Sequence, residues 1–165
     1  CPVPLEASGA CMMPFPRGWV SVDVTYRNKQ FRFIDAHLES KSASKNFLES
    51  LELLNGPALT ALPVIVAGDL NCDLGNPESS KYQTCMNFLN TGFRDAWNEA
   101  NPAEPGYTKH LPIMTERSDY VMIRDPIFSQ AAFLVGEEPE DRTPSGLWPG
   151  DHCGVVARLQ FSFED

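Results

Sequence analysis

A short apolar run that ends in polar residues constrains the fold of this chain more than any other feature. The run from Leu62 to Ala67 reads as a buried β-strand, and Gly-Asp-Leu-Asn follows it directly. Residues two apart on a strand face the same side, so we expect Asp69 and Asn71 to face one site together. Further along, Asp151-His152 precedes another strand-like run. Carboxylate, amide and imidazole groups at strand ends suit metal-assisted attack on a phosphoester, and this pattern predicts a hydrolase.

Length and charge narrow the class of protein. A chain of 165 residues is enough for one domain with a real core. Its net charge of −9 argues against non-specific binding along a polyanion, which needs a basic face. Nucleic-acid and phospholipid substrates stay open, because a divalent cation can invert the field at an acidic site. No apolar run approaches the roughly 20 residues that span a bilayer, so no transmembrane segment is expected.

The cysteines and the start of the chain say little about function. Five cysteines without a C-x-x-C pair disfavour both zinc ligation and an all-disulfide scaffold. One or two disulfides stay possible, with Cys1 and Cys11 as the nearest pair, and the compartment is open. The chain begins Cys-Pro-Val-Pro without an initiator Met, and we expect it to be the interior of a longer sequence.

Alternation and helical spacing predict an α/β domain with two helices and about six strands. The predicted strands are residues 19–26, 31–38, the run ending at Asp69, 117–123, 131–135 and 153–161. The predicted helices are residues 42–54 and 79–91, with an irregular lead-in at 1–16 and loops at 98–116 and 136–150. Two helices cover one face of such a sheet. The other face still carries Phe, Val and Ile, so we expect it to meet another segment or chain.

Further titratable side chains lie at the ends of predicted strands. His37 ends one strand on the face that it shares with Asp35, Asp119 begins another, and His152 adjoins Asp151. A single histidine at a strand end is more often structural than catalytic. Two of the three histidines lie beside acids here, however, and loops on a rigid sheet commonly carry catalytic groups. The pattern therefore favours a catalytic interpretation.

Other interpretations fit the spacing poorly. A calcium-binding EF-hand loop beginning at Asp69 needs Gly at its sixth place and Glu at its twelfth, where this chain has Leu74 and Ser80. Neither a G-x-S-x-G elbow nor a Gly-rich phosphate loop is present. Asp69 and Asn71 alone would be read as a turn after a buried strand. A turn does not account for the other motifs in their order.

Four short motifs together resemble one superfamily. They are Ala36-His37-Leu38, Gly68-Asp69-Leu70-Asn71, Arg117-Ser118-Asp119-Tyr120 and Gly150-Asp151-His152. In order and rough spacing they resemble the endonuclease/exonuclease/phosphatase superfamily, which has a deoxyribonuclease-I-like fold. The resemblance covers nearly the whole chain from Arg17 onward. The segments 16–20 and 144–152 are similar to a bacterial, often secreted branch.

The resemblance implies a role for each candidate catalytic residue. His152 would act on the attacking water or brace the scissile phosphate, and Asp119 would fix its tautomer. Asp69 would orient or deprotonate the nucleophilic water. Asn71 would hydrogen-bond the charged phosphoryl oxygens, and His37 would also contact the phosphate.

The implied cofactor is a divalent cation, usually Mg²⁺, which Asp151 would help to hold. The superfamily's first half is missing, and that half supplies one sheet, an Asn and the Glu that is the principal metal ligand. Glu6 is the only acid in residues 1–16, and its flanks do not fit the motif. Family strands also usually read Asn-Thr-His where this chain has Asp35-Ala36-His37. We expect residues 17–165 to form the C-terminal half of a four-layered α/β sandwich, one mixed sheet with helices on its outer face.

These inferences predict metal-dependent phosphoester hydrolysis by a phosphodiesterase or phosphatase. The alternative is a non-catalytic binding or scaffold half-domain, which the missing Glu favours and the otherwise intact site disfavours. The expected partner is the N-terminal half of the same domain, or a second copy bound through the uncovered sheet face. The substrate is a phosphoester that stays undecided between lipid head group, sugar phosphate and nucleic acid. The resemblance alone favours a secreted location.

Loop residues beside the predicted site are weaker candidates. Tyr107, Lys109 and His110 lie in a loop that could read the leaving group, although a solvated loop is the simpler interpretation. Trp148 precedes the Asp-His pair and could pack on substrate or pin its own loop.

Overall fold

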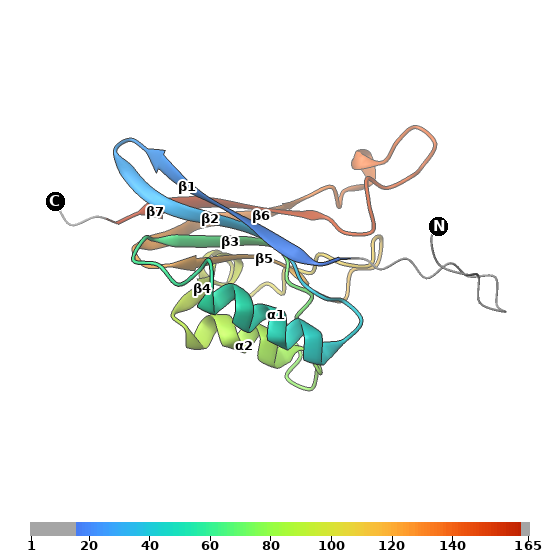
Figure 1. Ribbon diagram of the computed structural model, residues 1–165. Coiled ribbons are helices and arrows are strands. Elements are labelled where there is room, and N and C mark those ends of the chain that lie inside the picture. The colour runs from blue at the N-terminus through green and yellow to red at the C-terminus, as the bar shows by residue number, and fades with distance from the viewer. Residues whose placement is uncertain (1–15, 163–165) are drawn as a thin grey trace, which may run out of the picture.

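The computed structural model describes residues 16–162 in three layers (Figure 1). Helices α1 (Ala43–Asn55) and α2 (Tyr82–Asn90) form one outer layer, and a five-stranded sheet lies in the middle. A two-stranded sheet forms the third layer on the opposite face. The predicted lead-in at residues 1–16, apart from Pro16, lies outside the described residues, and so do Cys1 and Cys11, the nearest pair of cysteines.

The central sheet is mixed, as predicted, with strand order β1-β2-β3-β5-β4. Strands β1 (Gly18–Tyr26) and β2 (Lys29–His37) form an antiparallel hairpin, and β3 (Val64–Asp69) runs parallel to β2. Helix α1 supplies the crossover that such a parallel pair needs. Strand β5 (Asp119–Arg124) is antiparallel to β3 and carries the short edge strand β4 (Phe93–Asp95).

The main core lies between this sheet and the two helices. Every second residue of the central strands faces the helices, because side chains alternate along a strand. Ile34, Val66 and Met122 from the sheet are fully buried there together with Leu53 of α1 and Phe88 of α2. Ser42 caps α1, as its position predicts, by accepting a hydrogen bond from the Lys45 amide. The predicted helices are thus confirmed, α2 beginning a few residues late.

The structure differs from the prediction in where the last strands lie. Strands β6 (Ile127–Val135) and β7 (Gly154–Phe161) lie outside the central sheet and, among the strands of residues 16–162, pair only with each other. They cover part of the second sheet face, because Leu159 and Phe161 of β7 pack near Ile65, Ile123 and the half-buried aromatics of β2. The chain therefore covers part of the face that was expected to be open. Val20 and Val22 of β1 stay exposed.

Short elements complete the described chain. Helix α3 (Ala96–Ala100) follows β4 directly, and a single 3-10 turn, η1 (Pro139–Asp141), interrupts the long loop before β7. Within residues 16–162, none of the helices has the length and apolar character required to cross a membrane.

The aromatic contact under α2 gives a test of the core. Phe88 is fully buried and packs edge-to-face on Phe93 with 5.9 Å between ring centroids. We expect Phe88→Ala to lower the free energy of unfolding by about 3–5 kcal/mol, because it removes buried area and leaves a cavity. Phe47→Ala on exposed α1 surface should cost about 1 kcal/mol or less. Urea denaturation followed by circular dichroism measures both, and equal losses would contradict the packing described.

Candidate active site

Three adjacent strands of the central sheet end in one polar row. In the pairing registers His37 of β2 lies opposite Asp69 of β3, and Asp69 lies opposite Asp119 of β5. Residues that are paired across neighbouring strands project from the same face, so the three side chains lie side by side. His37 Nε2 is 3.4 Å from Asp69 Oδ2. The row faces the same side of the sheet as β6 and β7.

The backbone around Asp69 explains why Gly and Asn flank it. Gly68 has φ +133°, and a Cβ at this position would lie 2.1 Å from the carbonyl oxygen of Ala36, so only glycine fits. Asn71 has φ +48°, a left-handed conformation that Asn tolerates. The carboxylate of Asp69 accepts the Asn71 amide at 2.9 Å. One amide N–H of the buried Asn71 side chain donates to the Leu38 carbonyl at 2.9 Å, which leaves its other polar groups for a ligand.

Asp119 is held by three donors. Asp119 Oδ2 accepts hydrogen bonds from Thr108 Oγ1 at 2.6 Å and Ser118 Oγ at 3.1 Å. It lies 2.8 Å from His152 Nδ1. A carboxylate only accepts, so Nδ1 carries the proton and Nε2 is left to exchange a proton with a ligand. Sequence reasoning found the Asp119 and His152 residues but missed Thr108, which lies in a segment predicted to be a solvated loop.

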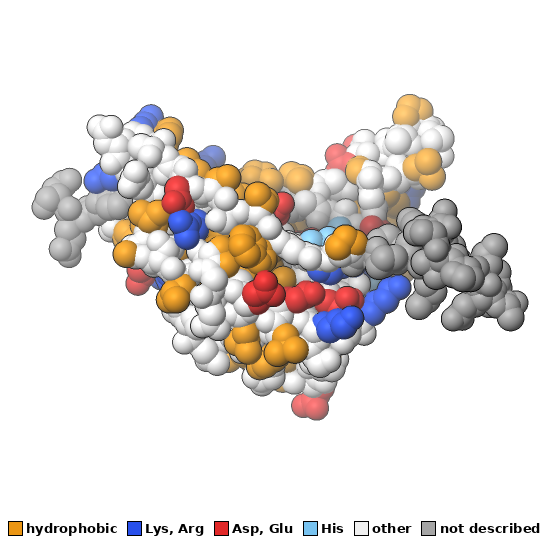
Figure 2. All heavy atoms as spheres, viewed as in Figure 1, with side chains coloured by type: hydrophobic (Ala, Val, Ile, Leu, Met, Phe, Trp, Pro, Cys, Tyr) orange, Lys and Arg blue, Asp and Glu red, His pale blue; other side chains and the backbone are white. Residues whose placement is uncertain are grey.

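All predicted site residues line one cavity of about 520 Å³. The lining residues are Arg17, His37, Ser40, Asp69, Asn71, Lys109, Asp119, Asp151 and His152. In Figure 2 histidine side chains are visible in a hollow of this face, close to acidic and basic side chains. The structure thus brings the six candidates together, while their individual roles stay predictions.

Arg17 is a member of the cavity that the sequence did not indicate as functional. Its Nη1 lies 2.6 Å from His37 Nε2 and 3.0 Å from Nδ1, and its Nη2 donates to Ser40 Oγ at 3.0 Å. The reason is topological, since Gly18 pairs with His37 at the start of β1 and places the preceding residue beside the histidine. A guanidinium here gives an acid-lined cavity a group that binds phosphate oxygens.

The donor set fits a divalent cation bound mainly by oxygen. One ligand atom each from Asp69, Asp119 and His152 lie within 4.8 Å of one another. Asp119 and His152 are already paired, whereas the exposed Asp151 carboxylate lines the same cavity as Asp69. Mg²⁺ usually takes one or two protein carboxylates and completes its shell with water. No Glu is among the described residues of this cavity.

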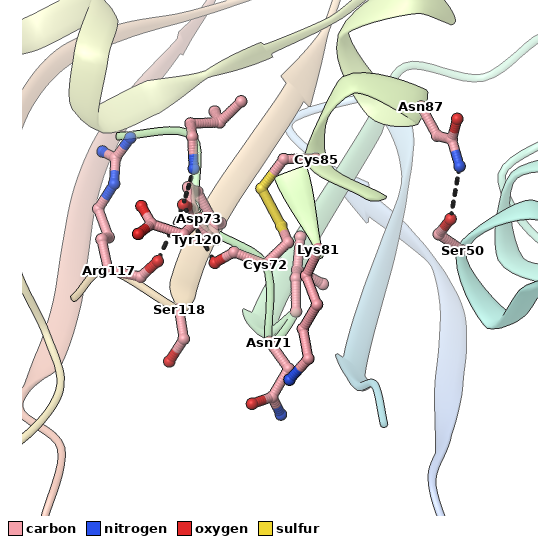
Figure 3. Close-up of a disulfide and its surroundings, with 12 residues drawn as sticks. Ser50, Asn71, Cys72, Asp73, Lys81, Cys85, Asn87, Arg117, Ser118 and Tyr120 are labelled. Carbon is pink, nitrogen blue, oxygen red and sulfur yellow. Dashed lines mark hydrogen bonds between the residues drawn. A yellow bond between two sulfur atoms is a disulfide. The ribbon is translucent and has the colours of Figure 1, made fainter. Parts of the chain in front are cut away.

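A disulfide fixes the loop that follows Asn71 (Figure 3). Cys72 is bonded to Cys85 of α2, with 5.7 Å between their Cα atoms, a pairing that the sequence left undetermined. The buried Tyr120 hydroxyl adds a second tie: it accepts from the Leu74 amide at 3.1 Å and donates to the Arg117 carbonyl at 3.0 Å. Burial raises the pKa of Tyr120 to about 12, so the hydroxyl stays a donor.

Comparison with known proteins identifies the fold. No protein-family model matches the sequence, and no curated protein matches it as a relative. Among solved structures, an endonuclease/exonuclease/phosphatase family protein from Bacteroides thetaiotaomicron has TM-score 0.71 and 17% identity over 92% of this chain. The fold is that of the endonuclease/exonuclease/phosphatase proteins. The predicted deoxyribonuclease-I-like architecture is thereby confirmed.

Two further structures of this fold carry more specific names. TDP2 from D. rerio, solved with a single-strand DNA product, has TM-score 0.70 and 21% identity over 87% of this chain. A mannosyl-6-phosphatase from Bacteroides thetaiotaomicron has TM-score 0.67 and 15% identity over 90% of this chain. The chain spans 57%, 62% and 58% of the length of the three structures, in the order given. It therefore corresponds to little more than half of the fold.

The disulfide gives a test of how the site loop is held. Replacing both Cys72 and Cys85 by Ser should lower the free energy of unfolding by roughly 2–4 kcal/mol, because the cross-link no longer restricts the unfolded chain. Urea denaturation with and without reductant measures the loss. Reductant should weaken the wild type and leave the double variant unchanged. An equal response of both proteins would contradict a structural disulfide.

Proposed function

We propose that this chain carries part of the active site of a metal-dependent phosphoester hydrolase. The observation that carries the proposal is the Asp119–His152 pair, with 2.8 Å between Oδ2 and Nδ1, next to the Asp69 and His37 side chains in one cavity. These groups come from four separate segments of the chain. A scaffold has no physical need to gather them at one cavity. The fold is shared with a protein named as a phosphatase and with one solved with a DNA product.

Each side chain has a defined task in attack of water on phosphorus. Asp69 accepts a proton from the nucleophilic water or orients it, because its carboxylate projects into the cavity. Asp119 holds the Nδ1 proton of His152, so Nε2 is the atom that exchanges a proton with the water or the phosphate. Arg17 and the amide of Asn71 donate to phosphoryl oxygens as negative charge builds up on them. His37, beside Arg17, contacts the same phosphate.

The divalent cation would be held through the carboxylates of Asp69 and Asp151, which line the cavity together. When bound, it supplies Lewis-acid stabilisation of the charged phosphoryl oxygens. Mg²⁺ is the proposed ion, since it accepts a site with few protein ligands and several waters.

The Asp119–His152 pair gives the direct test of this function. Asp119→Asn and His152→Gln should each lower phosphoesterase activity by about 10²–10⁴-fold, because each removes the proton relay. Release of nitrophenol from mono- and bis-p-nitrophenyl phosphate measures the rate. Asp23→Asn, in the part of β1 far from His37, is the control and should keep full activity. EDTA should abolish the activity of the wild type, and added Mg²⁺ should restore it. Absent activity in a folded chain supplied with its missing half favours the binding-module alternative, and activity that survives EDTA contradicts metal dependence.

We also propose that the missing half of the sandwich covers the surfaces left open here. Phe31 of β2 and Phe161 of β7 have ring centroids 5.2 Å apart, which places β7 over β2. Among the described strands β7 pairs with β6 and lies at an edge of the two-stranded sheet. A strand added at that edge would cover Val20 and Val22, whose exposed fractions are 58% and 50%. This chain spans only 57% and 62% of two of the matched structures, and the rest of that length supports the missing half, rather than a second copy of this chain, as the segment that covers this surface.

The isolated chain should show this open surface by weak self-association. Val22→Asp should reduce that association, because a charge desolvated in an apolar contact is costly. Thr25→Asp, on the opposite face of the same strand, is the matched control and should leave it unchanged. Sedimentation velocity over a concentration series measures the association. Identical sedimentation of wild type and both variants would contradict the assignment of the surface.

A location outside the reducing cytoplasm is proposed on two supports. The sequence resemblance favours a secreted branch, and the buried Cys72–Cys85 bond is of the kind that persists in oxidising compartments. Thiol titration of denatured protein from an exported and a cytosolic preparation tests this. The exported form should be the more stable, with those two thiols blocked.

A further inference from the structure

A second cavity adjoins the candidate active site. Its volume is about 390 Å³, within the range of about 300–1,000 Å³ that is usual for small-molecule sites. Asn71 and Lys109 line both cavities. Lys81 lines the second cavity, and its ammonium donates to the carbonyl of Ser40, a residue of the first. The two cavities are therefore neighbours that share part of their lining.

Three side chains that line the second cavity point the same way. Figure 3 shows Asn71, Lys81 and Ser118 directed to one side, away from the disulfide. The disulfide thus links the residue after Asn71 to helix α2, whose N-cap is Lys81. Partial burial lowers the pKa of Lys81, and the nearby ammonium of Lys109 lowers it further, while Asp69 and Glu116 raise it.

The lining of the second cavity is polar and balanced in charge. Lys81 and Lys109 are opposed by Asp73 and Glu116, and Lys109 Nζ is 3.4 Å from Glu116 Oε2. Most of the other lining groups are hydroxyls and amides that both donate and accept, from Asn71, Asn76, Ser79, Ser80, Thr115 and Ser118. Tyr107 contributes an aromatic ring. Such a mixture of donors and acceptors suits a ligand whose own groups both donate and accept hydrogen bonds.

Alcohol hydroxyls have this property, whereas acyl chains and ionised phosphates do not. An acyl chain would remove water from the ammonium and carboxylate groups without hydrogen-bonding to them. A second phosphate would face Asp73 and Glu116 as well as the two lysines. A nucleobase needs a stacking surface, and Tyr107 is the one aromatic residue of the described lining.

We propose that the second cavity binds the alcohol part of the substrate, and that this alcohol is a polyol such as a hexose. This specificity rests on the proposed phosphoester hydrolysis, because the phosphate must lie in the first cavity. Lys81 donates to polyol hydroxyls and Glu116 accepts from them. The loss of either group should weaken binding of the sugar part more than binding of the phosphate part.

A matched pair of ligands separates the alcohol from the phosphate. Glucose 6-phosphate and cyclohexylmethyl phosphate share a six-membered ring and a phosphate monoester, but only the former has ring hydroxyls. Isothermal titration of the 165-residue chain with each ester and with inorganic phosphate, in Mg²⁺, measures the three affinities. We expect glucose 6-phosphate to bind about tenfold tighter than the cyclohexyl ester, as hydrogen bonds to charged groups are lost with the hydroxyls.

Variants then assign the preference to the cavity. Lys81→Met and Glu116→Gln should each lower the preference for glucose 6-phosphate over the cyclohexylmethyl ester several-fold, a ratio in which any common change in phosphate affinity cancels. Lys29→Met, at the far end of β2 from His37, is the matched control. Thermal unfolding confirms that each variant is folded.

The outcomes distinguish this inference from the function on which it rests. Equal binding of the two esters, or a preference that survives both variants, overturns the polyol pocket and leaves phosphoester hydrolysis standing. Binding of neither ester nor inorganic phosphate overturns both proposals.

Discussion

The candidate site depends on the register in which three neighbouring strands end. His37, Asp69 and Asp119 occupy paired positions on β2, β3 and β5, and a slip of one residue in β3 would turn Leu70 toward the site and Asp69 toward the helices. Gly68 helps to fix the register, because no larger residue fits against Ala36 there. The row places two carboxylates on adjacent strands, which is unfavourable by itself. The donors around Asp119, above all Thr108 and His152, offset that repulsion.

Alternation along the sequence predicted most of the sheet, and helical spacing predicted both long helices. Alternation works because a half-covered strand must bury every second side chain, as β7 shows. The short elements β4 and α3 were missed, since three and five residues contain too little periodicity to be recognised. The separation of β6 and β7 was missed for a different reason. Alternation identifies which face of a strand is buried, but the layer that buries it depends on contacts between distant segments, such as Phe31 with Phe161.

The same distinction separates the predicted site residues from the missed ones. His37, Asp69 and Asp119 were predicted because each stands at the end of a recognisable strand, where a rigid sheet defines its direction. Arg17 and Thr108 were missed because they reach the site through strand pairing and loop packing that no local pattern encodes. Thr108 is fully buried although its surroundings are rich in Pro, Gly and charge. The disulfide escaped prediction because pairing depends on the distance between Cα atoms in space, 5.7 Å here.

Local charge, rather than net charge, decides what this acidic chain can bind. The net charge of −9 repels a long polyanion, yet Arg17, Lys81 and Lys109 gather around the carboxylates of the two cavities. The electrostatic field inside the cavities is set by these nearest groups, because solvent and salt screen the charges on the rest of the surface. A small phosphoester that fits within the cavities meets the cations, while a polymer would also meet the acidic surface beyond them. The charge distribution therefore agrees with the proposal of a small phosphoester whose alcohol part is uncharged.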